Sequence, residues 1–241
     1  MTAPAILVVG AGDATGGAIA RRFAREGFTA CVTRRTEDAL APLVERIEEE
    51  GGRARGFGCD ARDEDQMRAL VDTIEAEVGP LEAVVFNIGA NVNFPIRETT
   101  ARVYRKVWEM AAFAGFLTGR EAARVMVPRG RGTILFTGAT ASLRGGRGFS
   151  AFAGAKFALR ALAQSLAREL GPEGIHVAHP VIDGAIDTAF IRDNFPERYA
   201  LKDRDGILDP EHIADAYWML HQQPRDTWTH ELDLRPWMET F

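Results

Sequence analysis

The sequence predicts a single α/β domain built on a doubly wound, mainly parallel, seven-stranded sheet with helices on both faces. Short β-rich runs alternate with amphipathic helical runs along all 241 residues. Such alternation is typical of parallel strands joined by right-handed helical crossovers. The first run, Ala5–Val9, is apolar without alternation, as in strands that are buried on both faces. Because no composition shift, repeat or low-complexity tract marks a boundary, one domain is expected over residues 1–241.

Each element follows from its composition and its bounding residues. Strands are expected where β-branched and apolar residues cluster, and helices where apolar residues recur every three or four positions before a glycine. The expected strands are Ala5–Val9, 29–33, 55–59, Leu81–Phe86, Gly132–Phe136, 175–181 and Glu231–Leu234. The expected helices are 15–26, 37–50, 64–78, 101–127, Ser150–Leu170 and 210–222. The polar segment 189–207 is expected to be either a substrate lid or a plain surface loop.

Composition and charge exclude several classes of protein. The chain has 29 Lys and Arg against 34 Asp and Glu, and the net charge of −5 disfavours a nucleic-acid surface. Two cysteines, Cys31 and Cys59, exclude a disulfide framework, and no histidines have the spacing of a metal site. No apolar run is long enough to cross a membrane, and no signal peptide precedes the first strand. The sequence therefore predicts a cytoplasmic protein without a metal.

A glycine-rich loop joins the first expected strand to the first expected helix. It reads GAGDATGG over residues 10–17. Glycines at this point allow a tight turn and let a pyrophosphate approach the helix N-terminus, where free N–H groups and the helix dipole attract anions. A strand before the loop and a helix after it are the context that indicates a dinucleotide site. The loop is one residue longer than the common fingerprint of such sites.

That longer spacing resembles the short-chain dehydrogenase/reductase family, and further motifs follow in the family's order. Asp60 matches the aspartate beside the adenine, and Asn87-Ile88-Gly89 matches the end of the NNAG motif. Lys156 matches the lysine of the YxxxK motif, and the segment from Gly184 to Thr188 matches the PG…T segment beside the nicotinamide. The cofactor-binding residues that the resemblance implies are Gly10, Gly12, Asp13, Thr15, Gly16, Arg34, Asp60, Ala61, Asn87, Gly89, Lys156, Gly184, Ile186 and Thr188.

The resemblance extends over essentially the whole chain, and it implies a Rossmann-type fold, a nicotinamide cofactor and oxidoreductase activity. It also implies a homodimer or homotetramer. An apolar stripe on the helix Ser150–Leu170 either packs on the sheet or forms the helix-pair interface through which this family assembles.

The end of the second expected strand favours NADP(H) over NAD(H). An NAD-specific protein places an acid there for the ribose hydroxyls, whereas this chain has Thr33-Arg34-Arg35. Arg34 could hold a 2′-phosphate. Asp13 favours the opposite preference, because relatives that use NADP often carry a basic residue in this loop. The other interpretation of Arg34 and Arg35 is a solvated pair at the start of a helix.

Three of the family's four catalytic groups are absent. Phe152 stands four residues before Lys156, where the family has the tyrosine that transfers the proton. Ala139 stands at the position of the family's serine, and Ala112 at that of its asparagine. Neither phenylalanine nor alanine can exchange a proton, and losing a general acid–base costs roughly 10²–10⁴ in rate. The usual route of carbonyl reduction is therefore closed.

Several functions remain open. One is an NAD(P)(H)-dependent oxidoreductase that acts on a small carbonyl or alcohol, with Ser142, Thr140 or a water as the substitute proton donor. Another is a dinucleotide-binding pseudoenzyme that serves as a scaffold or redox sensor, and a third is a structural oligomer without a ligand. Both hydroxyls could instead bond only to the local backbone. Lys156 is expected to bind the cofactor's ribose, unless it is a solvated helix lysine. The substrate and the reaction direction are not identified by the sequence.

Overall fold

A computed structural model describes residues 2–240. Its strands all run parallel in one sheet, in the order β3-β2-β1-β4-β5-β7-β6, with β8 on the other side of β7. The strands are β1 (Ala5–Val9), β2 (Thr29–Arg34), β3 (Arg53–Gly58), β4 (Leu81–Phe86), β5 (Gly132–Phe136), β6 (Gly138–Ala139), β7 (Ile175–Ile182) and β8 (Glu231–Leu234). Because β5 and the short β6 pair with successive parts of β7, they occupy one position in the sheet. The predicted doubly wound, seven-stranded parallel architecture is confirmed.

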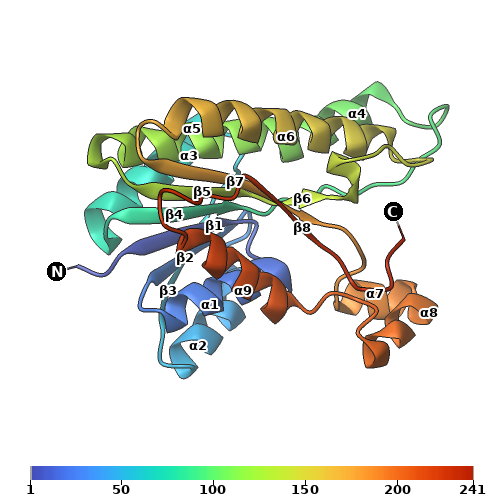
Figure 1. Cartoon of the computed structure of the whole chain (residues 1–241), viewed down its shortest axis with the longest axis horizontal. Helices are drawn as coiled ribbons and strands as arrows, with labels where there is room; N and C mark the ends of the chain where they lie inside the picture. Colours follow the sequence, from blue (N-terminus) through green and yellow to red (C-terminus); the bar gives the residue numbers. More distant parts are fainter. Residues whose placement is uncertain (1, 241) are drawn as a thin grey trace.

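Helices cover both faces of this sheet (Figure 1). One face carries α3 (Glu64–Thr73), α4 (Ala101–Trp108), α5 (Ala114–Met126) and α6 (Ser150–Leu170), and the other carries α1 (Thr15–Arg25), α2 (Ala41–Glu49) and α9 (Pro210–His221). Residues along β1 alternate between the two cores: Leu7 packs with α5 and α6, whereas Val8 packs with α1 and α9. Every residue of β1 is buried, which explains its unbroken apolar run. The apolar stripe of α6 also packs inward, with Leu159 fully buried.

Several expected elements differ in detail. The helix expected over 101–127 is interrupted by a π-helical turn at Glu109–Phe113 and ends in a 3₁₀ turn at Val127–Arg129. The helix expected over 64–78 likewise ends in a π-helical turn, and the one expected over 37–50 begins with a 3₁₀ turn. The strand expected at 55–59 begins two residues earlier and ends one residue earlier. Apolar periodicity locates helical segments, but one extra residue in a turn leaves the pattern almost unchanged.

The segment 189–207, which was expected to be a loop, is largely helical. It contains α7 (Ala189–Asn194), α8 (Pro196–Tyr199) and a 3₁₀ turn at Ala200–Arg204. The Thr188 hydroxyl accepts the N–H of Ile191 at 3.1 Å and so caps α7. The helical segment stands apart from the sheet, beside the end of the chain (Figure 1). Its role as a lid remains a prediction.

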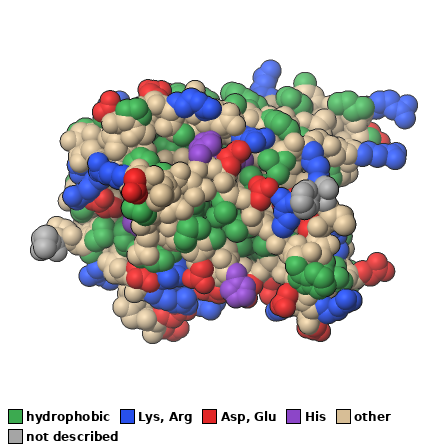
Figure 2. Space-filling view, viewed as in Figure 1, with side chains coloured by type: hydrophobic (Ala, Val, Ile, Leu, Met, Phe, Trp, Pro, Cys, Tyr) green, Lys and Arg blue, Asp and Glu red, His purple; other side chains and the backbone are tan. Residues whose placement is uncertain are grey.

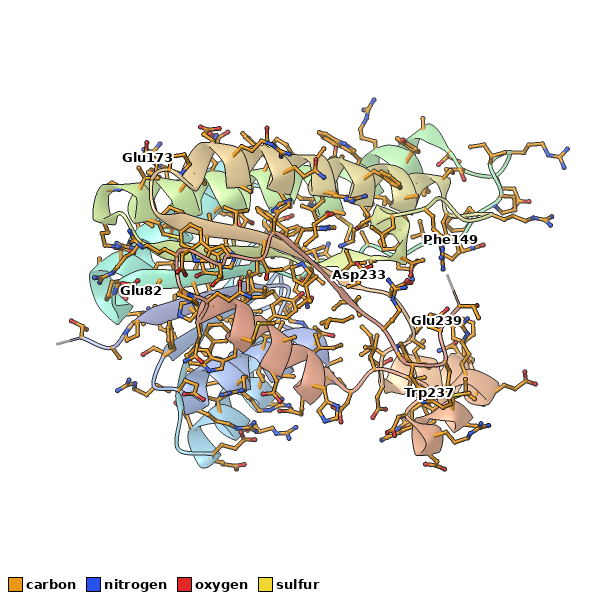
Figure 3. The ribbon with its side chains drawn as sticks, in the orientation of Figure 1. Glu82, Phe149, Glu173, Asp233, Trp237 and Glu239 are labelled. Atoms are coloured by element: carbon orange, nitrogen blue, oxygen red, sulfur yellow. The ribbon has the colours of Figure 1, made fainter. Side chains whose placement is uncertain are left out.

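The parallel strands define the edge at which a site can form. Their carboxyl ends all open at one edge, where doubly wound proteins bind ligands. Glu82 and Glu173 lie at the opposite, amino end of the sheet, while Phe149 lies beyond the carboxyl ends (Figure 3). Lys and Arg side chains project from the same end of the molecule, beyond α4 (Figure 2).

Candidate functional site

The glycine loop between β1 and α1 is packed tightly against the end of β4. Gly10 has a φ of +89°, a conformation that side-chain-bearing residues rarely adopt. A Cβ added to Gly16 would lie 2.6 Å from the Gly10 carbonyl oxygen. Asn87 Nδ2 donates a hydrogen bond to that same oxygen at 3.2 Å. Asn87 therefore holds the loop in place, and Gly16 is required for its close approach to the backbone.

The amino end of α1 lacks a side-chain partner. Ala14 occupies the N-cap and offers no side-chain hydrogen-bond acceptor, and the first turn contains no acidic residue. Thr15 Oγ1 is buried and has no hydrogen-bond partner among the described residues. A phosphate oxygen would accept hydrogen bonds from this hydroxyl and from the free N–H groups of the first turn. These residues therefore fit the pyrophosphate of a dinucleotide.

A cavity of about 290 Å³ opens beside this loop, lined by the ends of β1, β2 and β3. Arg34 lines it at the end of β2, with Nη1 3.9 Å from the carboxylate of Asp13, which is fully exposed. Asp60 and Ala61 line the opposite part. The hydrogen bond from the Arg62 guanidinium, at 2.9 Å from Nε, lowers the pKa of the Asp60 carboxyl. The cavity thus offers a guanidinium and an ionised carboxylate to one ligand.

Lys156 is the buried cation of the site. Its side chain is only 2% exposed, so it is not a solvated helix lysine. Nζ donates to the carbonyl oxygens of Thr137 at 2.8 Å and Ile88 at 3.1 Å. Burial lowers the pKa of Lys156 to about 7. In its protonated form the group has three N–H donors, so one more is left beside these two carbonyl oxygens.

The three side chains at the positions expected to hold the family's catalytic groups are apolar, and one of them lies near Lys156. Lys156 Nζ lies 5.9 Å from the centroid of the Phe152 ring, one helical turn away on α6. Ala139 packs in the same small apolar cluster as Phe152. Ala112 is buried in the π-helical turn at Glu109–Phe113, which packs against α6. None of these three side chains can donate a proton.

The two hydroxyls considered as substitutes have different partners. Ser142 is fully buried, and its Oγ accepts the N–H of Ala139 at 3.1 Å. Thr140 is partly exposed, and its Oγ1 donates to Oδ1 of Asp183 at 2.5 Å. Asp183 follows β7 directly and is only 2% exposed. Sequence reasoning missed Asp183 as a site residue, because only the pairing of β6 with β7 brings it to Thr140.

The remaining predicted cofactor residues border the open part of this edge. Apart from the adjoining residues, no atom of residues 2–240 lies within 4 Å of a Cβ added to Gly89, and among the same residues one added to Gly12 meets Arg34 Nη2 at 3.5 Å. Gly184 has a φ of +154° and packs against Pro236. Ile186 forms a bridge with Leu208, and Thr188 caps the start of α7. The segment after β7 is therefore fixed on one side of the edge and the glycine loop on the other.

A partly exposed ion pair ties α6 to β8. Arg160 donates to Glu231 from Nε at 2.6 Å and from Nη2 at 2.8 Å. His179 Nδ1 lies 3.3 Å from Glu231 Oε1, although neither ring nitrogen makes an aligned hydrogen bond. Burial lowers the pKa of His179 to about 4. His179 is thus a neutral histidine in the middle of β7 and faces no cleft.

Membrane helices, metal sites and free thiols complete the description of residues 2–240. No helix there is long and apolar enough to cross a membrane. No group of three His, Cys, Asp or Glu side chains in this range could hold a metal ion. Cys31 and Cys59 are both buried and free, and burial raises the pKa of each thiol, to about 12 and about 11 respectively.

The chain is similar to proteins of known class. A family model described as short chain dehydrogenase matches residues 4–198. Short-chain reductase protein NovJ from Streptomyces niveus is 32% identical over 202 residues, which are 84% of this chain and 76% of that protein. Zerumbone synthase from Zingiber zerumbet is 31% identical over 175 residues, which are 71% of this chain and 64% of that protein.

Solved structures resemble the whole chain. A short-chain dehydrogenase from Rhodopseudomonas palustris is 52% identical, with a TM-score of 0.83 and coverage of 97% of this chain and 99% of that one. A variant of actinorhodin polyketide ketoreductase with NADPH has a TM-score of 0.89, covering 98% of each chain. Its identity is 22%, so it shows likeness of fold alone.

Proposed function

Because the chain belongs to the short-chain dehydrogenase family, whose oxidoreductases use a nicotinamide dinucleotide, we propose that it binds NADP(H) and acts on a small carbonyl or alcohol without the family's tyrosine. The main support is the cavity at the carboxyl edge, where Arg34 stands at the end of β2 beside the uncapped start of α1. A bound dinucleotide supplies a hydride or accepts one. The residues of the chain must supply cofactor binding, substrate orientation and proton transfer.

Each part of the dinucleotide has residues at the site that can bind it. The first turn of α1 and Thr15 bind the pyrophosphate, and Asp60 contacts the adenine. Arg34 binds the 2′-phosphate, since a guanidinium holds phosphate through paired N–H donors. Asp13 reduces this preference, because its carboxylate lies 3.9 Å from the same guanidinium. Lys156 binds the nicotinamide ribose through the N–H that its two carbonyl partners leave over.

Calorimetric titration of NADPH and NADH tests this assignment. We expect NADPH to bind the wild type at least several-fold more tightly than NADH, because a charge-assisted hydrogen bond contributes about 1.5–3 kcal/mol. Arg34→Ala should remove that difference, and Lys156→Ala should weaken both cofactors by about 1.5–3 kcal/mol. Arg46→Ala is the control, since Arg46 is exposed on α2 and pairs with Glu50. Equal affinities of the wild type for both cofactors would contradict the proposed preference.

One observation favours a second function, a cofactor-binding pseudoenzyme. The tetrad positions Phe152, Ala139 and Ala112 are all apolar, and Lys156 already bonds to two backbone carbonyls. A protein that only binds the dinucleotide, as a scaffold or redox sensor, needs no proton donor at these positions. In that case NADPH would stabilise the fold, and no ketone or alcohol would be turned over.

A further inference from the structure

Thr140 and Asp183 form a hydrogen-bonded pair beside the vacated catalytic positions. Thr140 directly follows Ala139, which stands where the family has its serine, and Asp183 directly precedes Gly184. The hydroxyl proton of Thr140 points to Asp183 Oδ1 at 2.5 Å. The lone pairs of Thr140 Oγ1 therefore remain available to a further donor, and the residue is partly exposed. A substrate hydroxyl at the carboxyl edge of the sheet is such a donor.

The Asp183 carboxylate is buried and lies near an arginine that also pairs with Asp233. It is 2% exposed, and its Oδ2 lies 4.0 Å from Nη2 of Arg235, which also bonds to Asp233 Oδ2 at 2.5 Å. The backbone N–H of Asp183 donates to Leu234, which fixes the residue at the end of β7. Burying a carboxylate costs stability unless it is paired or hydrogen-bonded, and Thr140 and Arg235 supply such partners here.

We propose that Thr140 and Asp183 replace the missing tyrosine as a proton-accepting pair for the oxidation of an alcohol that bears an apolar substituent. This inference rests on the proposed function, because the hydride acceptor is the bound oxidised nicotinamide dinucleotide. The apolar substituent is inferred from the cluster that contains Phe152, Ala139 and Phe149. Thr140 is the catalytic residue, and Asp183 positions it and takes up its proton.

The step balances in atoms and electrons. The substrate O–H bond breaks, and its proton passes to Thr140 Oγ1 as the proton of Thr140 passes to Asp183 Oδ1. The C–H bond of the alcohol carbon breaks, and its hydrogen leaves with the electron pair to the nicotinamide. The two electrons of the O–H bond form the C=O bond. Asp183 ends protonated, and the product is a ketone or an aldehyde.

A carboxylate beside the segment that follows β7 also affects the cofactor itself. The oxidised nicotinamide ring carries a positive charge, and the reduced ring is neutral. A buried negative charge at Asp183 therefore favours the oxidised form, because charges attract strongly where water is excluded. This effect changes the ratio of the two affinities, and it needs no substrate to be measured.

The first experiment measures the affinities of NADP⁺ and NADPH by calorimetry for the wild type, Asp183→Asn and Asp233→Asn. Asp233 is the matched control, since it pairs with the same arginine but is 44% exposed. We expect Asp183→Asn to shift the affinity ratio about tenfold towards NADPH, and Asp233→Asn to leave it unchanged. An unchanged ratio in Asp183→Asn would overturn the inference. Failure of the wild type to bind either cofactor would instead remove the proposed function.

The second experiment follows NADP⁺-dependent oxidation of 1-phenylethanol and cyclohexanol. Thr140→Ser keeps the hydroxyl and should retain the wild-type rate within a few-fold. Thr140→Val keeps the shape and should lower kcat by about a hundredfold or more, as expected for the loss of a general base. The inference is wrong if Thr140→Val matches the wild type, or if the wild type binds NADP⁺ and oxidises neither alcohol.

Discussion

The chemistry of Lys156 is set by burial. Its Nζ has two backbone carbonyl partners, and the dominant influence on it is the loss of water, which lowers its pKa to about 7. In the unfolded chain a lysine titrates near pH 10.4. Between these two values the unfolded chain binds more protons than the folded protein, so stability must rise with pH. The folded protein without cofactor carries its full penalty at pH values below about 7.

Lys156→Met should therefore alter the pH dependence of stability. Methionine has a similar length and no charge, so the variant lacks the rise in the free energy of unfolding that the wild type shows from about pH 8 to about pH 10. We expect the wild type to gain about 1.4 kcal/mol per pH unit relative to the variant over this range. Urea unfolding at several pH values measures it. Parallel curves for the two proteins would show that Lys156 is not desolvated as described.

For single residues, the sequence identified side chains that belong to a motif of fixed spacing. It did not identify side chains that come together only in the folded chain. Lys156 was assigned from the YxxxK motif and Phe152 from its spacing to Lys156, and the structure places the two one turn apart on α6. Asp183 has no such signal, because its partner Thr140 is 43 residues away in the sequence. Ser142 had the right residue type, but its hydroxyl is buried against the backbone of Ala139.

Among the elements, the turn between β1 and α1 depends most on residue size. Gly16 has backbone atoms too close for a Cβ, whereas Gly89, which follows β4, borders open space. Gly16→Ala should lower the free energy of unfolding by roughly 1–3 kcal/mol, as overpacking does, and should prevent NADPH binding. Gly89→Ala should change the free energy of unfolding by less than about 0.5 kcal/mol.

NADPH binding gives a second way to distinguish the effects of substituting these two glycines. If Gly89 borders the dinucleotide, its added methyl group will weaken NADPH binding without loss of stability. Chemical denaturation and calorimetry of both variants supply the two readouts. Unaltered NADPH affinity in Gly89→Ala would place the cofactor elsewhere, and unaltered stability in Gly16→Ala would contradict the tight loop.

The sequence did not predict where the helices are interrupted. The π-helical turn at Glu109–Phe113 contains Ala112 and continues the apolar face of α4 into α5. A hydrophobic pattern reports which side of a helix is buried, and it does not report how many residues form one turn. The short helices of 189–207 were missed for a related reason, since they have no buried residue among Ala189–Tyr199.

For the whole molecule, the sequence was sufficient for the architecture. Strands such as β1 and β7, which are apolar except for two histidines in β7 and fully buried, lie inside the parallel sheet, and the intervening helices cover both faces. This topology alone brings the loops after β1, β2, β3, β4 and β7 to one edge. Assembly, substrate and reaction direction depend on surfaces and ligands that strand order does not determine.

The central claim is that this molecule keeps the dinucleotide site of its family and lacks the family's proton donor. The most direct measurement compares NADPH-dependent reduction of an activated ketone by the wild type and by the double variant Phe152→Tyr/Ala139→Ser, with NADPH binding confirmed for both. The new phenol would lie one helical turn from Lys156, beside the new hydroxyl, so we expect the double variant to be faster by about 10² or more. Equal rates in the two proteins would contradict the claim, because the wild type would then already possess an efficient proton donor.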